Sequence, residues 1–332
     1  MKGKLKLNAY SDDPVLENRF RWFLLLSNVI LLFLLVFFWL PLRDAATTYP
    51  LVSYTFANRA LYFFMRFVTI LGSEGFFLIL FSLFYWSYDK NLGFRGLVLM
   101  PLAIFLTSEV PKDIIRLPRP DIRGVAVPTY TFPSGHTSGA VSVWGYLAVK
   151  SRRRHFWHWA LVIVLLVALS RVMLGYHYPG DVLGGIVTGS AFLFFFVLLG
   201  SFTRVYDLVI KAPSRLLIPA ALVIMALLAY IPATFAPNFM GYIAGALTGH
   251  IMDNERLRYS CSGSFGQHLT RGVIGILGLA VIILGLGSLV PAGYKLFIFI
   301  VYTFSAFWVT YLAPALYQKI GLSPGKSPDL QE

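Results

Sequence analysis

Three short segments carry charged and polar residues beside long apolar runs. They are "KDIIRLPRP" (112–120), "FPSGHTSG" (132–139) and "SRVMLGYHYPGD" (170–181). Charged groups at membrane depth are costly and therefore indicate a functional site. The residue types favour phosphate chemistry, because a guanidinium matches phosphate oxygens in a bidentate way and histidine can act as a nucleophile or as an acid and base.

The cations and one helix start could together bind a phosphate-like dianion. Ser134 and Gly135 precede a long apolar run, so they should open a helix. A helix N-terminus presents free N–H groups to an anion, and Gly135 lets the backbone approach closely. The cationic donors are Lys112, Arg119 and Arg171, with Arg116 and Arg123 near by.

Two histidines supply the reactive groups. Pro179 makes a continuous helix unfavourable, so we expect Asp181 to open the next helix with its carboxylate turned back to His177. A carboxylate on one ring nitrogen fixes the tautomer and leaves the other nitrogen free. Such a histidine can attack phosphorus, and His136 can protonate the leaving alcohol and then activate water.

Composition indicates the setting of these segments. The chain has 332 residues, of which 57% are hydrophobic and only 13% charged, and its mean hydropathy is +0.70. Soluble domains carry about 25% charged residues. We therefore predict an all-α, polytopic membrane protein. The net charge of +13 is attributed to cytoplasmic loops and not to nucleic-acid binding, and the single cysteine, Cys261, allows no internal disulfide.

Ten apolar segments are predicted to span the bilayer as helices, each of about the required length. The segment 51–70 is apolar but contains Arg59 and Arg66, and we expect it to lie at the interface. The predicted spans are 22–42, 73–88, 93–111, 134–150, 157–174, 181–201, 215–233, 238–252, 272–290 and 294–316.

The distribution of Lys and Arg predicts the orientation. Ten spans place both termini on one side, and that side holds most of the 28 cations, so the positive-inside rule makes the termini cytoplasmic. The three polar segments then face the extracytoplasmic side. Arg43 and Arg66 are interpreted as interfacial anchors. The outside cations are Arg43, Arg59, Arg66, Lys112, Arg116, Arg119, Arg123, Arg171 and Lys295.

The three motifs have the forms K-x6-R-P, PSGH and S-R-x5-H-x3-D. In this order and spacing they closely resemble the signature motifs of the type 2 phosphatidic-acid phosphatases, or lipid phosphate phosphatases, a superfamily shared with the vanadium haloperoxidases. The resemblance covers about 60–200. The segment 72–95 also looks like the region before the first motif. We interpret Glu74 there as a helix-start carboxylate; a residue that supports the phosphate-binding side chains from behind is the alternative.

The resemblance implies a role for each matching residue, and no metal ion or other cofactor. The phosphate-binding residues would be Lys112, Arg119, Arg171, Ser134 and Gly135. The catalytic residues would be His177, as the nucleophile that forms a phosphohistidine, His136, as the acid for the leaving group, and Asp181, which orients His177.

The resemblance ends near 201, so we expect four parts. They are a cytoplasmic N-terminal segment (1–21), a six-span core (22–201), additional C-terminal spans (212–318) and a cytoplasmic tail (319–332). In the additional spans Gly241, Gly245 and Gly249 share one helix face. Small residues at this spacing favour helix packing; a substrate groove or a homodimer surface is the alternative. His250, Asp253 and Glu255 suggest no mechanism.

The leading hypothesis is a metal-independent phosphatase that hydrolyses a lipid phosphate or diphosphate in the bilayer, in a bacterial inner or plasma membrane. A phosphotransferase using the same phosphohistidine is a second hypothesis, because water and a sugar hydroxyl are both acceptors. A lipid transporter or scaffold with a relict site is the third. Phosphatidate, prenyl diphosphates and sphingoid phosphates all remain open as substrates.

Overall fold

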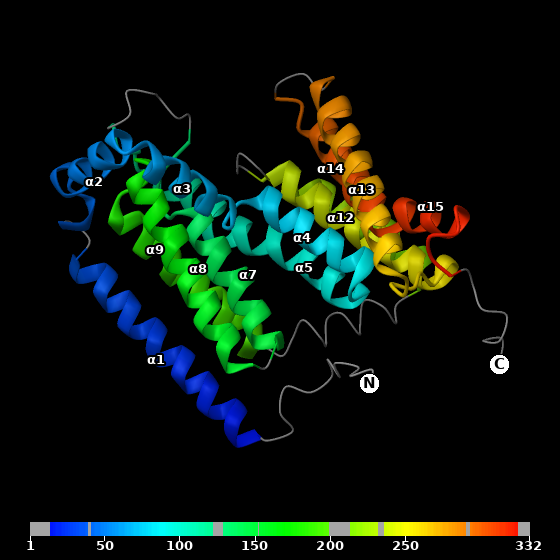
Figure 1. Ribbon diagram of the computed structural model, residues 1–332, viewed down its shortest axis with the longest axis horizontal. Coiled ribbons are helices and arrows are strands. Elements are labelled where there is room, and N and C mark those ends of the chain that lie inside the picture. The colour runs from blue at the N-terminus through cyan, green and yellow to red at the C-terminus, as the bar shows by residue number, and fades with distance from the viewer. Residues whose placement is uncertain are drawn as a thin grey trace. The chain divides into compact units, whose positions relative to one another are not determined.

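The computed structural model describes residues 14–38, 41–121, 129–151, 153–198, 213–231, 236–289 and 293–324. Over these residues the chain is all-helical and has no strand (Figure 1). The predicted all-α class is therefore confirmed for this part of the chain. Arg123, most of the segment 1–21 and the last eight residues of the tail lie outside the described residues.

Each of the ten predicted spans contains a helix over at least part of its described residues. By length and composition, four of the described helices could cross a membrane: Lys90–Ile115, Arg154–Met173, Phe265–Leu286 and Lys295–Lys319. Helices α3 (Arg59–Ile70) and α4 (Glu74–Ser87) pass the same test as a pair that is bent by 51°.

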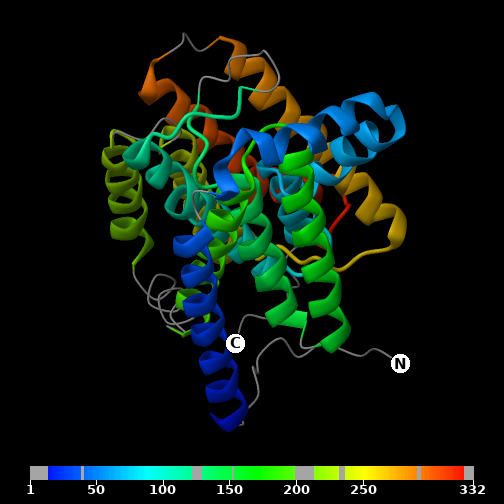
Figure 2. The same ribbon diagram turned by 90° about the vertical axis from the view of Figure 1, so that its left-hand side faces the viewer.

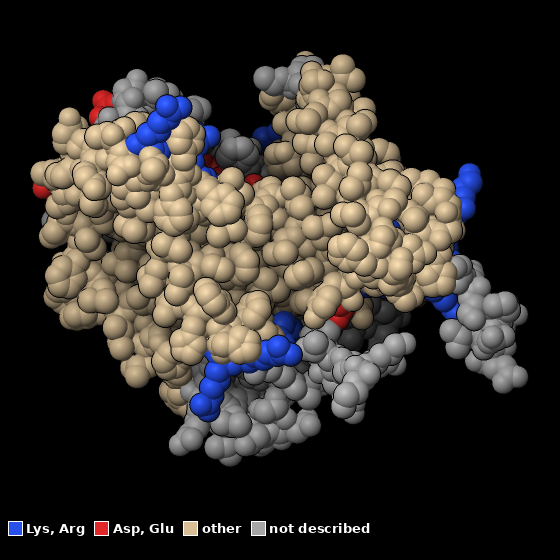
Figure 3. Space-filling model, in the orientation of Figure 1, with Lys and Arg blue, Asp and Glu red and all other residues tan. Residues whose placement is uncertain are grey.

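The surface of these helices is apolar. On α13 (Phe265–Ala280) and the π-helical turns that continue it (Val281–Leu286), Leu277, Val281 and Leu284 are 61%, 70% and 72% exposed. Figure 3 shows that most of the described surface in one view carries neither acidic nor basic side chains. Apolar helices with exposed leucine and valine are the surface expected of an integral membrane protein.

The chain divides into two compact units, residues 1–74 with 106–204, and residues 75–105 with 205–332. The first unit is built around α7 (Gly135–Ser151), α8 (Arg154–Met173) and α9 (Pro179–Leu198), which lie side by side (Figures 1 and 2). Its other elements are α1 (Pro14–Phe38), η1 (Pro41–Arg43), α2 (Ala45–Ala57), α3 and α6 (Val110–Ile115).

Helices α7 and α9 approach closely because α9 has glycines where they meet. A Cβ built at Gly185 would lie 2.7 Å from the Ser134 carbonyl oxygen, and one at Gly189 would lie 2.7 Å from that of Ser138. Both distances are too short for a real side chain. The glycines therefore fix the start of α7 against the start of α9, which is where the second and third polar segments lie.

The second unit packs α12 (Ala236–Met252) against α14 (Lys295–Phe307). A Cβ at Gly241 would lie 2.4 Å from the Phe299 carbonyl oxygen, and one at Gly249 would lie 2.1 Å from Thr310 Oγ1. The glycine face is thus filled within the chain, which confirms the packing interpretation. The unit also contains η3 (Asp253–Leu257), α11 (Ser214–Leu228), α13, η5 (Trp308–Leu312) and α15 (Ala313–Lys319).

Helices α4 and α5 (Lys90–Ile104) group with these C-terminal helices, whereas we expected them in the six-span core. Long-range hydrogen bonds give the reason. The Trp86 indole donates to the Val309 carbonyl at 2.8 Å, and the Tyr85 hydroxyl donates to the Thr310 carbonyl at 3.0 Å. Both aromatic side chains are completely buried.

The residues without an expected mechanism, His250 and Asp253, belong to a buried polar cluster of this unit. His250 stacks on Phe94 with ring centroids 3.9 Å apart, and its Nδ1 lies 3.2 Å from the Tyr85 hydroxyl. Asp253 accepts a hydrogen bond from Lys90 at 2.8 Å. Each polar group has a partner, as buried polar groups require, so the cluster stabilises the second unit.

Candidate active site

All predicted site residues that the structure describes lie in the first unit. The second polar segment forms the start of α7, as predicted. Ser134 precedes the helix, and its side chain accepts a hydrogen bond from the Thr137 hydroxyl at 3.0 Å. A Cβ at Gly135 would lie 2.8 Å from Ser108 Oγ and 3.5 Å from Lys112 Nζ. Glycine at this position therefore lets Ser108 pack against the N-terminus of α7, and Lys112 Nζ lies beside it.

The third segment forms the end of α8 and the turn that follows. Gly175 adopts φ +70°, a left-handed conformation that glycine adopts without strain and that ends the helix. The Arg171 guanidinium donates to Thr69 Oγ1 on α3 at 2.8 Å and lies 4.3 Å from the centre of the Tyr176 ring. Arg171 is buried, so its direction is fixed by these contacts.

The first segment provides Lys112 and Arg119, which have different surroundings. Lys112 forms an ion pair with Glu109 one turn earlier, at 2.7 Å, and Ser108 also donates to this carboxylate. Arg116 ends α6 in a left-handed conformation, is exposed, and donates to the carbonyl of Asp113. The structure thus brings Lys112 to the site and turns Arg116 away from it.

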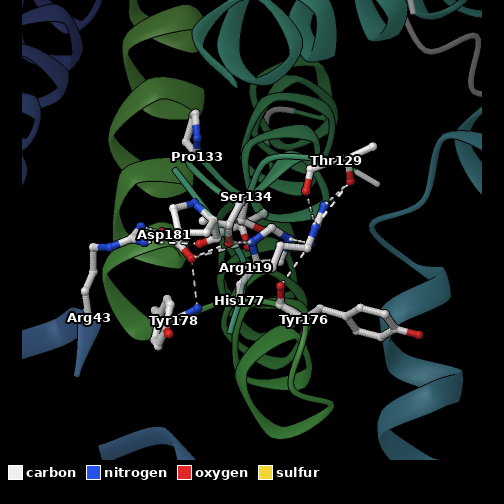
Figure 4. Close-up of polar contacts among 12 residues, drawn as sticks. Arg43, Arg119, Thr129, Pro133, Ser134, Tyr176, His177, Tyr178 and Asp181 are labelled. Atoms are coloured by element: carbon white, nitrogen blue, oxygen red, sulfur yellow. Dashed lines mark hydrogen bonds and ion pairs between the residues drawn. The ribbon is translucent and has the colours of Figure 1, made fainter. Parts of the chain in front are cut away.

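Arg119 connects the first segment to the third. Its Nε and Nη2 donate to Thr129, and its Nη1 donates to the Tyr176 carbonyl at 2.9 Å. The same Nη1 lies 3.3 Å from Nε2 of His177 (Figure 4). One ring nitrogen of His177 therefore faces a phosphate-type cation, as a nucleophile for bound phosphate should.

The other ring nitrogen of His177 faces Thr131 and not Asp181. His177 Nδ1 lies 3.1 Å from Thr131 Oγ1, and Thr131 Oγ1 lies 2.5 Å from Asp181 Oδ2. The direct distance between His177 Nδ1 and Asp181 Oδ2 is 3.8 Å, too long for a hydrogen bond. The carboxylate is turned toward the imidazole, as expected, but a threonine hydroxyl stands between them.

Asp181 has two further partners. Its Oδ2 accepts from the backbone N–H of Tyr178 at 2.9 Å, and its Oδ1 accepts from the guanidinium of Arg43 (Figure 4). Arg43 also lies over the Tyr178 ring, with 5.0 Å to its centroid. The interpretation of Arg43 as an interfacial anchor is therefore wrong: it pairs with a buried carboxylate.

The surroundings of His177 favour its neutral form. His177 lies in the loop between α8 and α9 and is only 2% exposed. Burial, together with the positive charges of Arg171, Arg119 and Lys112, lowers the pKa of His177 well below its usual range. A neutral imidazole keeps the lone pair that nucleophilic attack requires. His136, the second residue of α7, lies within electrostatic range of these cations and of His177.

Among the partners of the site residues that the sequence did not predict are Thr131, Arg43 and Glu109. Thr131 is two residues before Pro133 of the second segment, and Arg43 is far from all three segments in sequence. No sequence pattern pointed to Arg43, which was counted among the outer-side cations and interpreted as an interfacial anchor.

Comparison with known proteins places the chain in a family of phosphatases. Residues 93–205 match the PAP2 superfamily, and residues 237–326 match the transmembrane extension of PAP2 superfamily phosphatases. The chain therefore belongs to the PAP2 superfamily. The curated relatives that it matches are named as lipid phosphatases.

Individual relatives differ in the lipid for which they are named. The chain is 30% identical to mouse sphingosine-1-phosphate phosphatase 2 over 44% of this chain and 44% of that protein. It is 36% identical to phosphatidylglycerophosphatase B of Bacillus subtilis over 31% of this chain and 56% of that protein. It also matches an undecaprenyl-diphosphatase of the same bacterium, with 40% identity over 24% of this chain and 42% of that protein. The chain thus spans about half the length of the curated relatives it matches.

Among solved structures, the chain is similar to a transmembrane PAP2-type phosphatidylglycerolphosphate phosphatase from Bacillus subtilis. The sequence identity is 28% and the TM-score 0.40, and the match covers 53% of this chain and 96% of that one.

Proposed function

We propose that this protein is a phosphatase that hydrolyses a lipid phosphate monoester or diphosphate through a phosphohistidine on His177. The observation that carries the proposal is the position of His177: Nε2 faces Arg119, and Nδ1 connects through Thr131 to Asp181. Lys112 and Arg171 complete the cationic surroundings. Membership of the PAP2 superfamily supports the same reaction.

The first half-reaction transfers the phosphoryl group to the protein. The phosphate oxygens bind Lys112, Arg119 and Arg171, with the Ser134 side chain and the Gly135 amide at the helix start. Nε2 of His177 attacks phosphorus and forms a P–N bond, while the P–O bond to the leaving group breaks; the leaving group is the lipid alcohol for a monoester and the lipid monophosphate for a diphosphate. His136 donates a proton to the leaving oxygen. The dianion offsets the surrounding positive charge, which favours the protonated form of His136.

The second half-reaction releases phosphate. His136, now neutral, accepts a proton from water, and the water oxygen attacks phosphorus. The P–N bond breaks and Nε2 of His177 regains its lone pair. Before substrate binds, Lys112 is paired with Glu109, so a phosphate must compete with that carboxylate for the ammonium group. The site can therefore favour doubly charged phosphates over singly charged ones.

The same proposal includes the membrane arrangement. Ten spans would place both termini in the cytoplasm and the site at the extracytoplasmic face. The support is the distribution of Lys and Arg along the chain. A lipid phosphate could then enter the site from the outer leaflet.

The test is phosphate release by the purified full-length protein in detergent micelles. A panel would contain phosphatidate, phosphatidylglycerophosphate, sphingosine 1-phosphate and undecaprenyl diphosphate, each with and without a lipid or sugar acceptor. We expect phosphate release that needs no acceptor and is lost in His177→Ala. Transfer to an acceptor without phosphate release would indicate a phosphotransferase. No reaction with any member of the panel would contradict the proposal.

A further inference from the structure

Asp181 has fixed hydrogen-bond donors on both oxygens, and these determine its protonation. The Tyr178 backbone N–H and the Arg43 guanidinium can only donate, and they contact Oδ2 and Oδ1 respectively. The positive guanidinium on Oδ1 and the backbone N–H on Oδ2 both stabilise the ionised carboxylate, whereas a protonated Asp181 would leave the Arg43 charge without its anionic partner. Asp181 is completely buried, and a buried carboxylate requires such partners. Asp181 is therefore held as a carboxylate.

The charge on Asp181 determines the direction of the next hydrogen bond. Thr131 Oγ1 lies 2.5 Å from Asp181 Oδ2, and a threonine hydroxyl has one hydrogen to donate. Because an ionised carboxylate can only accept, that hydrogen goes to Asp181. Thr131 Oγ1 must then accept from His177 Nδ1, which is 3.1 Å away. Nδ1 of His177 therefore carries the ring proton.

The tautomer follows from this chain of donors. With the proton on Nδ1, a neutral His177 keeps its lone pair on Nε2, the nitrogen that faces Arg119 Nη1 at 3.3 Å. Guanidinium can only donate, so it agrees with a lone pair at that position. In the opposite tautomer, the hydrogen on His177 Nε2 would face a hydrogen on Arg119 Nη1. Thr131 and Arg43 lie outside the catalytic set, and both favour the tautomer of His177 that has its lone pair on Nε2.

We propose that Thr131 and Arg43 are positioning residues for phosphoryl transfer: Thr131 relays the hydrogen bond between Asp181 and His177, and Arg43 holds Asp181 ionised so that Nε2 of His177 is the nucleophile. The inference rests on the proposed phosphatase function. Neither side chain is assigned a contact with the phosphate. Their effect should therefore appear in the rate of phosphoryl transfer and not in substrate binding.

Substitutions at Thr131 separate the hydroxyl from the shape of the side chain. Thr131→Val keeps the branched shape and removes the donor, so the tautomer of His177 is no longer fixed. We expect kcat to fall by about 10² or more, with KM within about threefold of wild type. Thr131→Ser restores the hydroxyl and should keep kcat within about tenfold of wild type.

Substitutions at Arg43 test the same relay from its other end. Arg43→Met removes the charge beside Asp181 and should lower kcat by about tenfold to 10²-fold, while Arg43→Lys should recover most of the loss. Arg59→Met is the matched control, since Arg59 is exposed and contacts the Phe63 ring. It should leave kcat unchanged.

The decisive experiment measures the wild type and these variants with one lipid phosphate, and follows both steady-state turnover and the single-turnover formation of acid-labile phosphoprotein. Vanadate inhibition and thermal unfolding in detergent show whether each variant keeps a folded phosphate site. If Thr131→Val does not fold, Arg43→Met compared with Arg43→Lys gives the same test.

The histidine nitrogens give a second readout that a purely structural role would not change. In 15N-histidine spectra, with His177→Gln used for assignment, wild-type His177 should show a protonated Nδ1, and Thr131→Val should show a mixture of tautomers. Normal kcat in both Thr131→Val and Arg43→Met, in an active wild-type background, would overturn this inference and leave the phosphatase proposal intact. An inactive wild type would overturn the phosphatase proposal itself.

Discussion

Replacing Arg171 by lysine keeps a positive charge in the site but removes the planar guanidinium. In the structure this group donates to Thr69 and stacks on the Tyr176 ring at 4.3 Å. A lysine ammonium is a point charge that neither stacks in this way nor presents a two-pronged edge to a phosphate. Arg171→Lys should therefore lose one charge-assisted hydrogen bond to the substrate.

The size of the loss follows from the strength of such hydrogen bonds. A hydrogen bond to a charged group contributes about 1.5–3 kcal/mol. Each 1.4 kcal/mol corresponds to a factor of about ten, so kcat/KM should fall by about tenfold to 150-fold. Vanadate, which can occupy the same cationic cradle, should inhibit the variant less strongly than the wild type.

The assay is phosphate release from a lipid phosphate in mixed detergent micelles. The control is an arginine-to-lysine substitution at Arg66, outside the site. Arg66 on α3 also contacts a tyrosine, with its guanidinium 5.9 Å from the Tyr62 ring centroid, but it is exposed. Arg66→Lys should change kcat/KM by no more than about twofold. If Arg171→Lys also stays within about twofold of wild type, Arg171 does not bind the phosphate by its guanidinium fork.

Three further predictions address orientation, pH and packing. In a cysteine-free background, an impermeant thiol reagent applied to intact cells should label Tyr130→Cys and not His155→Cys; labelling of both from outside contradicts the orientation. Because the pKa of His177 is lowered in the folded protein, the unfolded chain binds more protons below about pH 6.5, and folding stability falls as the pH falls. Between pH 7.5 and 5.5 the wild type should lose about 1.4 kcal/mol more than His177→Gln in thermal unfolding, and equal losses would show that this histidine is not held neutral. Gly245→Ala would place a methyl group 2.0 Å from a carbonyl oxygen of α14 and should destabilise the protein by about 1–3 kcal/mol. Gly285 has open space around it, so Gly285→Ala should leave the stability unchanged. Equal unfolding temperatures of the two variants would contradict the packing of α12 on α14.

The features of the site that could be predicted from the sequence are those formed by residues close together in the chain. The pattern PSGH predicts the helix start at Gly135, and the segment 170–181 predicts His177 and Asp181 on the two sides of one turn. These features depend on local chain geometry, so a short pattern contains them. The positions of apolar helices were predictable for the same reason, because each needs only a run of apolar residues.

Features that depend on distant partners could not be predicted. The pairing of Arg43 with Asp181 joins two residues separated by most of the first unit, and a lone arginine near a span end has many uses. Thr131 is one hydroxyl among several near the second motif. Likewise, α4 and α5 have the same apolar composition as the core helices. Their place in the second unit depends on long-range contacts such as the hydrogen bonds of Tyr85 and Trp86 to the C-terminal helices.

The phosphohistidine intermediate is the central claim, and trapping it is the most direct test. The full-length protein would be mixed with a lipid phosphate carrying 32P, quenched in base, and digested to locate the label. A positioned proton donor contributes about 10²–10⁴ in rate, so His136→Ala should be severely impaired on the lipid. It should be much less impaired on p-nitrophenyl phosphate, whose leaving group needs no proton.

His136→Ala should also accumulate label from p-nitrophenyl phosphate, because water is no longer activated to attack the intermediate. We predict an acid-labile, base-stable label on the peptide that contains His177, and no label in His177→Ala. Label that persists in His177→Ala, or phosphate release by that variant at the wild-type rate, would show that His177 is not the nucleophile and would contradict the account.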